Sequence, residues 1–245
     1  MARLWILSDL HLEEGPFRHG RPDFDVLVNA GDTREGDVRA CVEDTARLAD
    51  GRPAILVLGN HDLYGVPLDR ALEVAARLGA RTGVDVLGLG PVHCEGIAFA
   101  GGTLWDDVRP TVRHPDGRRP DLTGILAGTE PAYFAPPARM PTSEPLYVEG
   151  PGGIRPATHE DVRRRRTGTL SMLASACADV VVTHHPPTDQ DLAAAGWPSL
   201  WIHGHVHGHA RTPRRGGETV LNAACSPSFD PGLVLDLGPG PSPGR

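Results

Sequence analysis

The sequence predicts an α/β fold, in which strands and helices alternate within one domain. Short apolar runs rich in β-branched residues alternate, over the first ~100 residues, with segments whose apolar residues recur at helical spacing. This alternation predicts βα crossovers and a largely parallel sheet for the N-terminal half. The chain has 245 residues, of which 40% are hydrophobic and 22% charged, as expected for a globular domain with a substantial core.

The N-terminal half contains two expected helices among its expected strands. Residues 38–49 have helical spacing, and residues 68–78 form a second helical segment that Gly79 is expected to end. The strands are expected at residues 4–8, 26–30, 54–58, 84–89 and 97–101. The strands at residues 4–8, 26–30 and 54–58 are interpreted as buried.

From residue 106 to residue 156 the regular pattern stops. This stretch is rich in proline, glycine and arginine, and it is interpreted as an inserted cap or lid. Thr158 followed by Asp161 is typical of a helix N-terminus, and the helix is expected to run to about residue 178. Further strands are expected at residues 180–183, 200–203, 219–222 and 233–237. Residues 1–237 are therefore expected to form one domain, followed by a disordered tail at 238–245.

The bulk composition excludes several classes of protein. A net charge of −7 argues against a general nucleic-acid-binding protein, so nucleic acid is an unlikely partner. No apolar window approaches the ~18 residues of a membrane span, and the N-terminal apolar run is too short for a signal peptide. The four cysteines include no Cys-x-x-Cys pair. A cytoplasmic protein with reduced thiols is expected.

Five short fragments supply side chains of the type that bind divalent metals. They are Asp9-Leu10-His11, Gly31-Asp32, Gly59-Asn60-His61-Asp62, Thr183-His184-His185-Pro186 and Gly204-His205-Val206-His207. Four of the five follow a predicted strand, and the carboxyl ends of strands in open α/β sheets converge on one edge. Aspartate, histidine and asparagine suit divalent transition metals. The sequence therefore predicts a shared metal site at this edge.

Seven candidate ligands are more than one tetrahedral zinc ion requires, and they match two ions that share a bridging carboxylate. Two dications, two aspartates and one hydroxide leave a local charge of about +1, which favours an anionic substrate. Manganese is the expected metal, while iron, zinc and magnesium also suit these ligands. A small phosphate ester is the expected partner, and the oligomeric state is not predicted.

The five fragments resemble the motif set of the calcineurin-like metallophosphoesterase superfamily, in the same order, from Asp9 to His207. Residues 103–106 are also similar to a bacterial phosphohydrolase subgroup of that superfamily. The resemblance implies a four-layer αββα sandwich with two mixed sheets. It implies that one metal binds Asp9, His11, Asp32 and His207, and that the other binds Asp32, Asn60, His184 and His205. It further implies that Asn60 and His61 contact substrate, with His61 as the general acid or a hydrogen-bond donor to the transition state, and Asp32 as the bridging carboxylate.

The function expected from the motifs is that of a phosphoric ester hydrolase, preferably a phosphodiesterase, which acts through a hydroxide bridging a dinuclear metal centre. Alternatives within the superfamily are a phosphomonoesterase (nucleotide phosphatase) or a nuclease. A third alternative is a non-catalytic scaffold that uses this fold to bind proteins. Such scaffolds are expected to lack some ligands, whereas all seven are present here.

Some positions depart from the family pattern or leave a choice open. Many relatives continue the second motif as G-D-x-x-D, where this chain has Glu35, so Glu35 is a candidate to orient His61. His184 is preferred to His185 as the ligand because it is nearer the strand end. His203 is expected to be a core residue or a residue that contacts a ligand, and not a ligand itself. The arginines at 163–166 are interpreted as a solvated helix face, and Arg118-Arg119 as a weak candidate for substrate contact.

Overall fold

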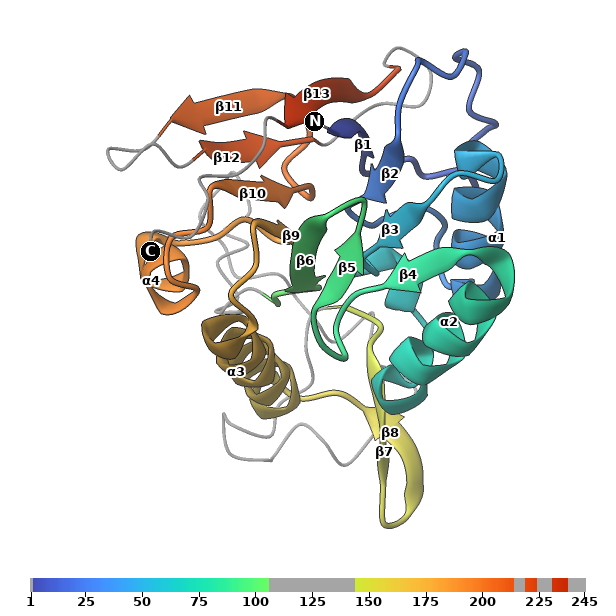
Figure 1. The fold of residues 1–245 in the computed structure, drawn as a ribbon. Helices are drawn as coiled ribbons and strands as arrows, with labels where there is room; N and C mark the ends of the chain where they lie inside the picture. The colour runs from blue at the N-terminus through green and yellow to red at the C-terminus, as the bar shows by residue number, and fades with distance from the viewer. Residues whose placement is uncertain (1, 106–143, 214–218, 224–230, 238–245) are drawn as a thin grey trace, which may run out of the picture.

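Two β-sheets lie face to face between two pairs of helices (Figure 1). The computed structural model describes residues 2–105, 144–213, 219–223 and 231–237. Helices α1 (Val38–Ala49) and α2 (Leu68–Thr82) cover the outer face of one sheet, while α3 (His159–Ala176) and α4 (Asp189–Ala194) cover the other. The expected four-layer αββα sandwich is therefore confirmed.

The first sheet has the strand order β13-β1-β2-β3-β4. Its strands are β1 (Ala2–Leu7), β2 (Val26–Asn29), β3 (Ala54–Leu56), β4 (Val84–Val86) and β13 (Leu233–Leu237). The first four are parallel to one another, as the βα alternation predicts. Parallel neighbours require long crossover connections, and the segments between these strands are long enough to provide them. β13 is antiparallel to β1, with Ala2 opposite Leu237.

The second sheet has the strand order β11-β12-β10-β9-β6-β5. Its strands are β5 (Val92–Cys94), β6 (Ile97–Gly102), β9 (Val180–Thr183), β10 (Leu200–His203), β11 (Ala210–Pro213) and β12 (Thr219–Asn222). The four central strands are parallel, and the two edge strands are antiparallel to their neighbours. The carboxyl ends of β1–β3 and of β9 and β10 carry the five fragments named above.

The main core lies between the two sheets. Ile6, Val28 and Ile55 from the first sheet pack with Val182 and Ile202 from the second, and all five are fully buried. A second cluster joins the first sheet to α1 and α2, and a third joins the second sheet to α3 and α4. Alternate residues of one strand therefore face different layers, which explains why the strands are continuous apolar runs.

An ordered hairpin lies within the stretch expected to form an irregular cap. β7 (Tyr147–Gly150) pairs with β8 (Gly153–Pro156), and buried Leu146 and Val148 join the core beside α1 and α2. In Figure 1 the hairpin projects from the sandwich beside α2. Residues 106–143, which include Arg118-Arg119, and the tail at 238–245 lie outside the described residues.

The prediction that Gly79 ends the second helix is wrong. α2 continues to Thr82, and Gly83 ends it with a φ of 78°. A Cβ on Gly79 would lie 2.2 Å from the carbonyl oxygen of Val84. Gly79 is therefore needed because α2 packs closely against the start of β4, and not because the helix stops there.

The interpretation of residues 163–166 as a solvated helix face is wrong for two of the four arginines. Arg165 pairs with Asp69 of α2, while Arg166 bonds the carbonyl of Trp105 at 2.8 Å and Asp191 of α4 at 2.6 Å. Both side chains thus connect α3 to neighbouring elements. None of the helices in the described ranges combines the length and the hydrophobicity needed to cross a bilayer.

Candidate metal centre

The structure brings six of the seven candidate ligands into two groups at the carboxyl ends of the strands. One group is Asp9, His11 and His207, and the other is Asp32, His184 and His205; within each group the potential ligand atoms lie within 4.8 Å of one another. His11 Nε2 is 4.0 Å from Asp32 Oδ2, so the two groups adjoin. Each group combines residues from both sheets.

Several of these residues have an unusual backbone conformation. Asp9, His11, Asp32 and His205 have φ values of 56°, 42°, 53° and 66°, in the left-handed region that L-residues with a Cβ seldom occupy. Such a backbone turns the chain sharply at the strand end. Non-glycine residues held in this region cluster at functional sites, because the surrounding structure must compensate for the strain.

Two glycines allow the strand-end loops to approach the aspartates. A Cβ on Gly59 would lie 2.1 Å from Asp32 Oδ1. A Cβ on Gly204 would lie 1.9 Å from Ser8 Oγ and 2.4 Å from Asp9 Oδ2. These glycines are therefore required by the close contact between a backbone and a carboxylate.

Asp62 holds two of these loops together. It is fully buried, and its carboxylate accepts backbone N–H bonds of 2.7 to 2.9 Å from Asp32, Thr33, Arg34 and Gly59. The thiol of Cys41 in α1 also contacts it at 3.0 Å. Asp62 thus connects the loop after β2 to the loop after β3, which places Asp32 beside Asn60.

Hydrogen bonds orient the individual ligands. The backbone N–H of His205 donates to both oxygens of Asp9 at 3.0 Å, and Ser8 Oγ donates to Asp9 Oδ2 at 2.5 Å. His184 Nδ1 bonds the carbonyl of Ala30 at 2.9 Å, which leaves its Nε2 to face Asp32 Oδ2 at 3.1 Å. Bonds of this kind fix the ring orientation of metal-binding histidines.

Two buried atoms indicate that the residues fit a metal pair. Asn60 Oδ1 is inaccessible to solvent and has no hydrogen-bond partner among the described residues, while His184 Nε2, equally inaccessible, has only the charge contact with Asp32 Oδ2 at 3.1 Å. Buried polar atoms without partners are rare in folded proteins. Both atoms are of the type that binds divalent transition metals, and both belong to the set expected for the second ion. The donor set therefore fits the cations that the sequence implies.

The charges of the imidazoles are set by their surroundings. Burial opposes protonation of His184, but the carboxylate of Asp32 outweighs it and raises the pKa of His184 to about 10. Burial, together with the nearby charge of His184, lowers the pKa of His205 below its ordinary value and that of His185 well below it. Neutral imidazoles are the form that binds metals, so a cation bound by His184 would replace its proton.

His61 begins the short 3₁₀ helix η1 (His61–Leu63) and lies at the rim of the first group. Its ring centroid is 4.8 Å from that of His11 and 4.5 Å from that of Tyr64, and its backbone N–H donates to Asp32 Oδ1 at 2.9 Å. Glu35 Oε2 lies 3.6 Å from His61 Nδ1. Glu35 is thus near enough to attract this ring, although the distance is too long for a hydrogen bond.

The remaining histidines of these fragments lie outside the two groups. His185 Nδ1 bonds the carbonyl of Thr103 at 3.1 Å, and its ring packs against that of His205 at 4.2 Å. The group with Asp32 therefore contains His184 in preference to His185. His203 is buried, and its Nδ1 contacts the carbonyl of Gly204, as expected for a core residue.

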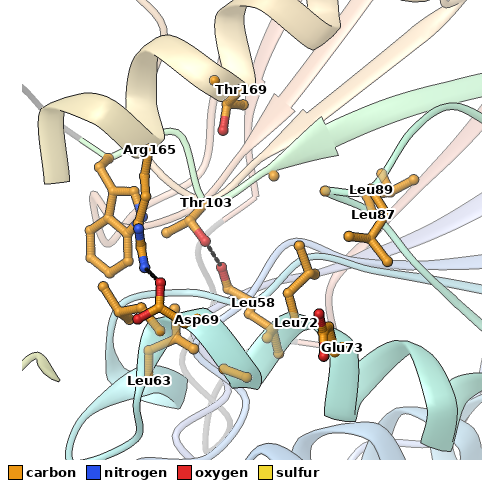
Figure 2. Close-up of a pocket in the computed structure, with 16 residues that line it drawn as sticks. Leu58, Leu63, Asp69, Leu72, Glu73, Leu87, Leu89, Thr103, Arg165 and Thr169 are labelled. Atoms are coloured by element: carbon orange, nitrogen blue, oxygen red, sulfur yellow. Dashed lines mark hydrogen bonds and ion pairs between the residues drawn. The ribbon is translucent and has the colours of Figure 1, made fainter. Parts of the chain in front are cut away.

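A cavity of about 370 Å³ lies between α2 and α3 (Figure 2). Leu72 of α2 lines one side, Thr169 of α3 lines the other, and the Asp69–Arg165 ion pair spans the gap between the helices. None of the seven candidate ligands is among the residues that line it. The cavity is therefore a neighbour of the metal centre and not part of it.

Three residues that support the candidate centre were not identified from the sequence. They are Ser8, Tyr64 and Glu144. Asp62 belongs to the third fragment, but no role was predicted for it, and Ser8 directly precedes the motif residue Asp9, so its position in the chain offered a signal. Glu144 offered none, because it lies 84 residues from Asn60.

Comparisons with known proteins identify the fold. No protein-family model matches the sequence, and no curated protein matches it. The crystal structure of a phosphopantetheinyl hydrolase from Mycobacterium tuberculosis matches with a TM-score of 0.57 and 17% identity, over 98% of each chain. A dimetal phosphatase from Danio rerio matches with a TM-score of 0.39 and 12% identity, over 91% of this chain and 87% of that chain. The first match shows a shared fold along nearly the whole chain, while the second is too distant to carry an argument.

Proposed function

We propose that this chain, which has the metallophosphoesterase fold, is a metal-dependent phosphoesterase that acts preferably on phosphodiesters. The observation that carries the proposal is the pair of adjoining ligand groups, one around Asp9 and one around Asp32. Two divalent cations bound there would lower the pKa of an attacking water and stabilise the negative charge of the phosphoryl group. Manganese is the proposed metal.

Asp32, Asn60 and His61 would each have a separate role in the reaction. Asp32 lies between the two groups and would be shared by both ions, while Asn60 would complete the second group. His61 lies at the exposed rim beside His11, where it would contact substrate and protonate the departing oxygen. Asn60 and His61 would therefore act as neighbouring substrate contacts.

The charge balance supports a phosphodiester substrate. Two dications, the carboxylates of Asp9 and Asp32, and an attacking hydroxide give a local charge of about +1. A phosphodiester carries one negative charge and matches this balance, whereas a monoester near neutral pH carries nearly two. The name of the matched hydrolase adds phosphopantetheinyl esters to the substrates worth testing.

The experiment compares the wild type with Asp32→Asn and His61→Gln, using manganese and bis(p-nitrophenyl) phosphate. We expect Asp32→Asn to lose bound metal and activity together. We expect His61→Gln to keep its metal and to lose ~10²–10⁴-fold in kcat, because it removes a proton donor. His93→Gln is a matched control, since His93 is exposed on β5.

A panel of phosphate esters then separates the alternatives. Linear diesters, cyclic nucleotides, monoesters and a phosphopantetheinyl ester should be ranked by kcat/KM, and we expect a diester to rank first. A monoester in first place would favour the phosphatase alternative. Unchanged hydrolysis in both Asp32→Asn and His61→Gln would reject the proposed mechanism, and a wild type without metal or activity would favour the scaffold alternative.

A further inference from the structure

The side-chain amide of Asn60 can act as a metal ligand only if its oxygen faces the site. Its Nδ2 donates to the hydroxyl of Tyr64 at 2.9 Å and to Glu144 Oε1 at 2.9 Å, so both amide hydrogens are used. Its Oδ1 is buried and without a partner in the described structure. The amide therefore turns its nitrogen towards Glu144 and its oxygen away from it.

The chemistry of the partners determines this orientation. An ionised carboxylate only accepts hydrogen bonds, so Glu144 must face the nitrogen of the amide and not the oxygen. The Tyr64 hydroxyl donates to the same Glu144 Oε1 at 3.1 Å, which leaves it to accept from Asn60. A flipped amide would place two oxygens against each other and turn an NH₂ group towards the cations.

The residues that follow Glu144 in the chain are fixed to the segment after η1 and to α2. The next residue, Pro145, accepts a backbone hydrogen bond from Gly65 at 2.9 Å, and Leu146 is buried in the core beside α2. Further along, the backbone N–H of Glu149 donates to Asp69 Oδ2 at 2.6 Å. Glu144 therefore lies in the segment that leads into β7, far along the chain from the loop after β3 that contains Asn60.

We propose that Glu144 is a positioning residue for the metal centre, which orients the Asn60 amide so that its oxygen binds the second cation. This inference rests on the proposed function only in assuming that the centre binds metal. It assigns a role in the centre to the segment that begins at Glu144, which contains none of the five motifs.

The direct test is titration of metal-free protein with Mn²⁺ by calorimetry. We expect two equivalents to bind the wild type. Glu144→Leu keeps the volume but removes the acceptor, so we expect one of the two sites to weaken by ~10–100-fold while the other is unchanged. Glu144→Gln keeps an oxygen acceptor, so we expect it to restore most of that affinity. Tyr64→Phe, which keeps the ring beside His61, should weaken the same site by a smaller factor.

A double-mutant cycle separates positioning from general destabilisation. If Glu144 acts through Asn60, then Asn60→Ala and the double variant with Glu144→Leu should bind Mn²⁺ equally, within about twofold. Glu149→Gln is the matched control, because it lies in the same segment and pairs with Arg70 away from the site. We expect its two affinities to equal those of the wild type.

The possible failures can be told apart. Unchanged affinities in Glu144→Leu, or strictly additive losses in the double variant, would overturn the positioning role while leaving the proposed function intact. A wild type that binds two Mn²⁺ but hydrolyses no phosphate ester would overturn the proposed function, and the same titrations would still decide the role of Glu144.

Discussion

Four candidate ligands, Asp9, His11, Asp32 and His205, hold their backbones in the left-handed region. Each such residue costs of order 1 kcal/mol relative to a relaxed backbone, and the cost is lowest for aspartate. Hydrogen bonds compensate for part of it: Asp32 is held by Asp62, and the N–H of His205 is bonded to Asp9. The metal centre is therefore built from residues that would not adopt this geometry alone.

The glycines beside these residues lead to a prediction at the residue scale. Gly59→Ala and Gly204→Ala would each force a methyl group against a carboxylate, so we expect each to weaken Mn²⁺ binding at least ~10-fold and to lower stability by about 1–3 kcal/mol. Mn²⁺ titration and thermal unfolding measure the two effects.

The control for these variants is Gly168→Ala in α3. A Cβ there meets no atom within 4 Å, and the residue is exposed within a helix. We expect wild-type metal binding and up to ~1 kcal/mol of added stability, because alanine favours the helix. Equal Mn²⁺ affinities in all three variants would show that the close contacts at Gly59 and Gly204 are not required for metal binding.

Single residues differed in how far the sequence revealed them. The six residues that the structure gathers into two groups could be proposed from the sequence because each belongs to a motif near a strand end. The partner of Asn60 could not, because the contact with Glu144 depends on where a distant hairpin packs. The role of Gly79 was misjudged for a similar reason: its neighbour, Val84, becomes close only when α2 packs on the sheet.

At the scale of elements, α3 is fixed by its first turn. Thr158 and Asp161 form a reciprocal capping box, as the sequence predicts, and Arg155 adds two hydrogen bonds to the Asp161 carboxylate at 2.7 and 3.0 Å. The hydrogen bond from Arg155 holds the pKa of Asp161 well below its usual range, against the opposing effect of burial. The helix is thus tied to β8, which carries Arg155.

This cap predicts a dependence of stability on pH. Since the pKa of Asp161 is lower in the folded state than in the unfolded one, its contribution is complete above about pH 5 and is lost as the pH falls below about 4. Asp161→Asn should cost about 1–2 kcal/mol at pH 7, and the difference from the wild type should shrink towards pH 3. The expected loss of stability is modest because Arg155 is half exposed and solvent screens its ion pair with Asp161.

Thermal unfolding between pH 7 and pH 3 measures this effect. Glu160→Gln is the control, because Glu160 is exposed in the same turn of the helix. A difference between Asp161→Asn and the wild type that stays constant over this range would contradict the assignment.

Regular elements were predictable where they are long or consist of a run of apolar residues. The bounds of α1, β9, β10, β12 and β13 agree with those expected from apolar spacing. β5, β11 and α4 were missed because three to six residues are too few to show a periodic pattern. The β7–β8 hairpin was missed because a glycine- and proline-rich sequence gives no strand signal, although pairing and the burial of Val148 stabilise it.

At the scale of the whole molecule, the candidate metal centre spans both sheets. Asp9, Asp32 and Asn60 follow strands of the first sheet, while His184 and His205 follow strands of the second. Bound cations would therefore hold the two halves of the sandwich together. The arrangement in four layers was predicted only through the family resemblance, since alternation of elements does not say that the strands divide into two sheets.

This arrangement predicts that metal stabilises the fold. At a free Mn²⁺ concentration of ~100 times the Kd, binding to one site adds about 2.7 kcal/mol. For a chain of this length we expect Tm to rise by roughly 5–10 °C relative to protein in a chelator. Asp32→Asn should lose at least half of the rise, and calorimetry at fixed metal concentrations measures both. A Tm that does not respond to Mn²⁺ would mean that the two groups do not bind it.

The pairing of β13 with β1 also has a consequence for how the chain reaches its native state. These strands lie next to each other in the sheet although Ala2 is opposite Leu237, so one closing contact joins nearly the whole length of the polypeptide. During synthesis the edge of β1 that pairs with β13 stays unpaired until β13 has left the ribosome. Assembly of the first sheet is therefore expected to be slow and to benefit from chaperones.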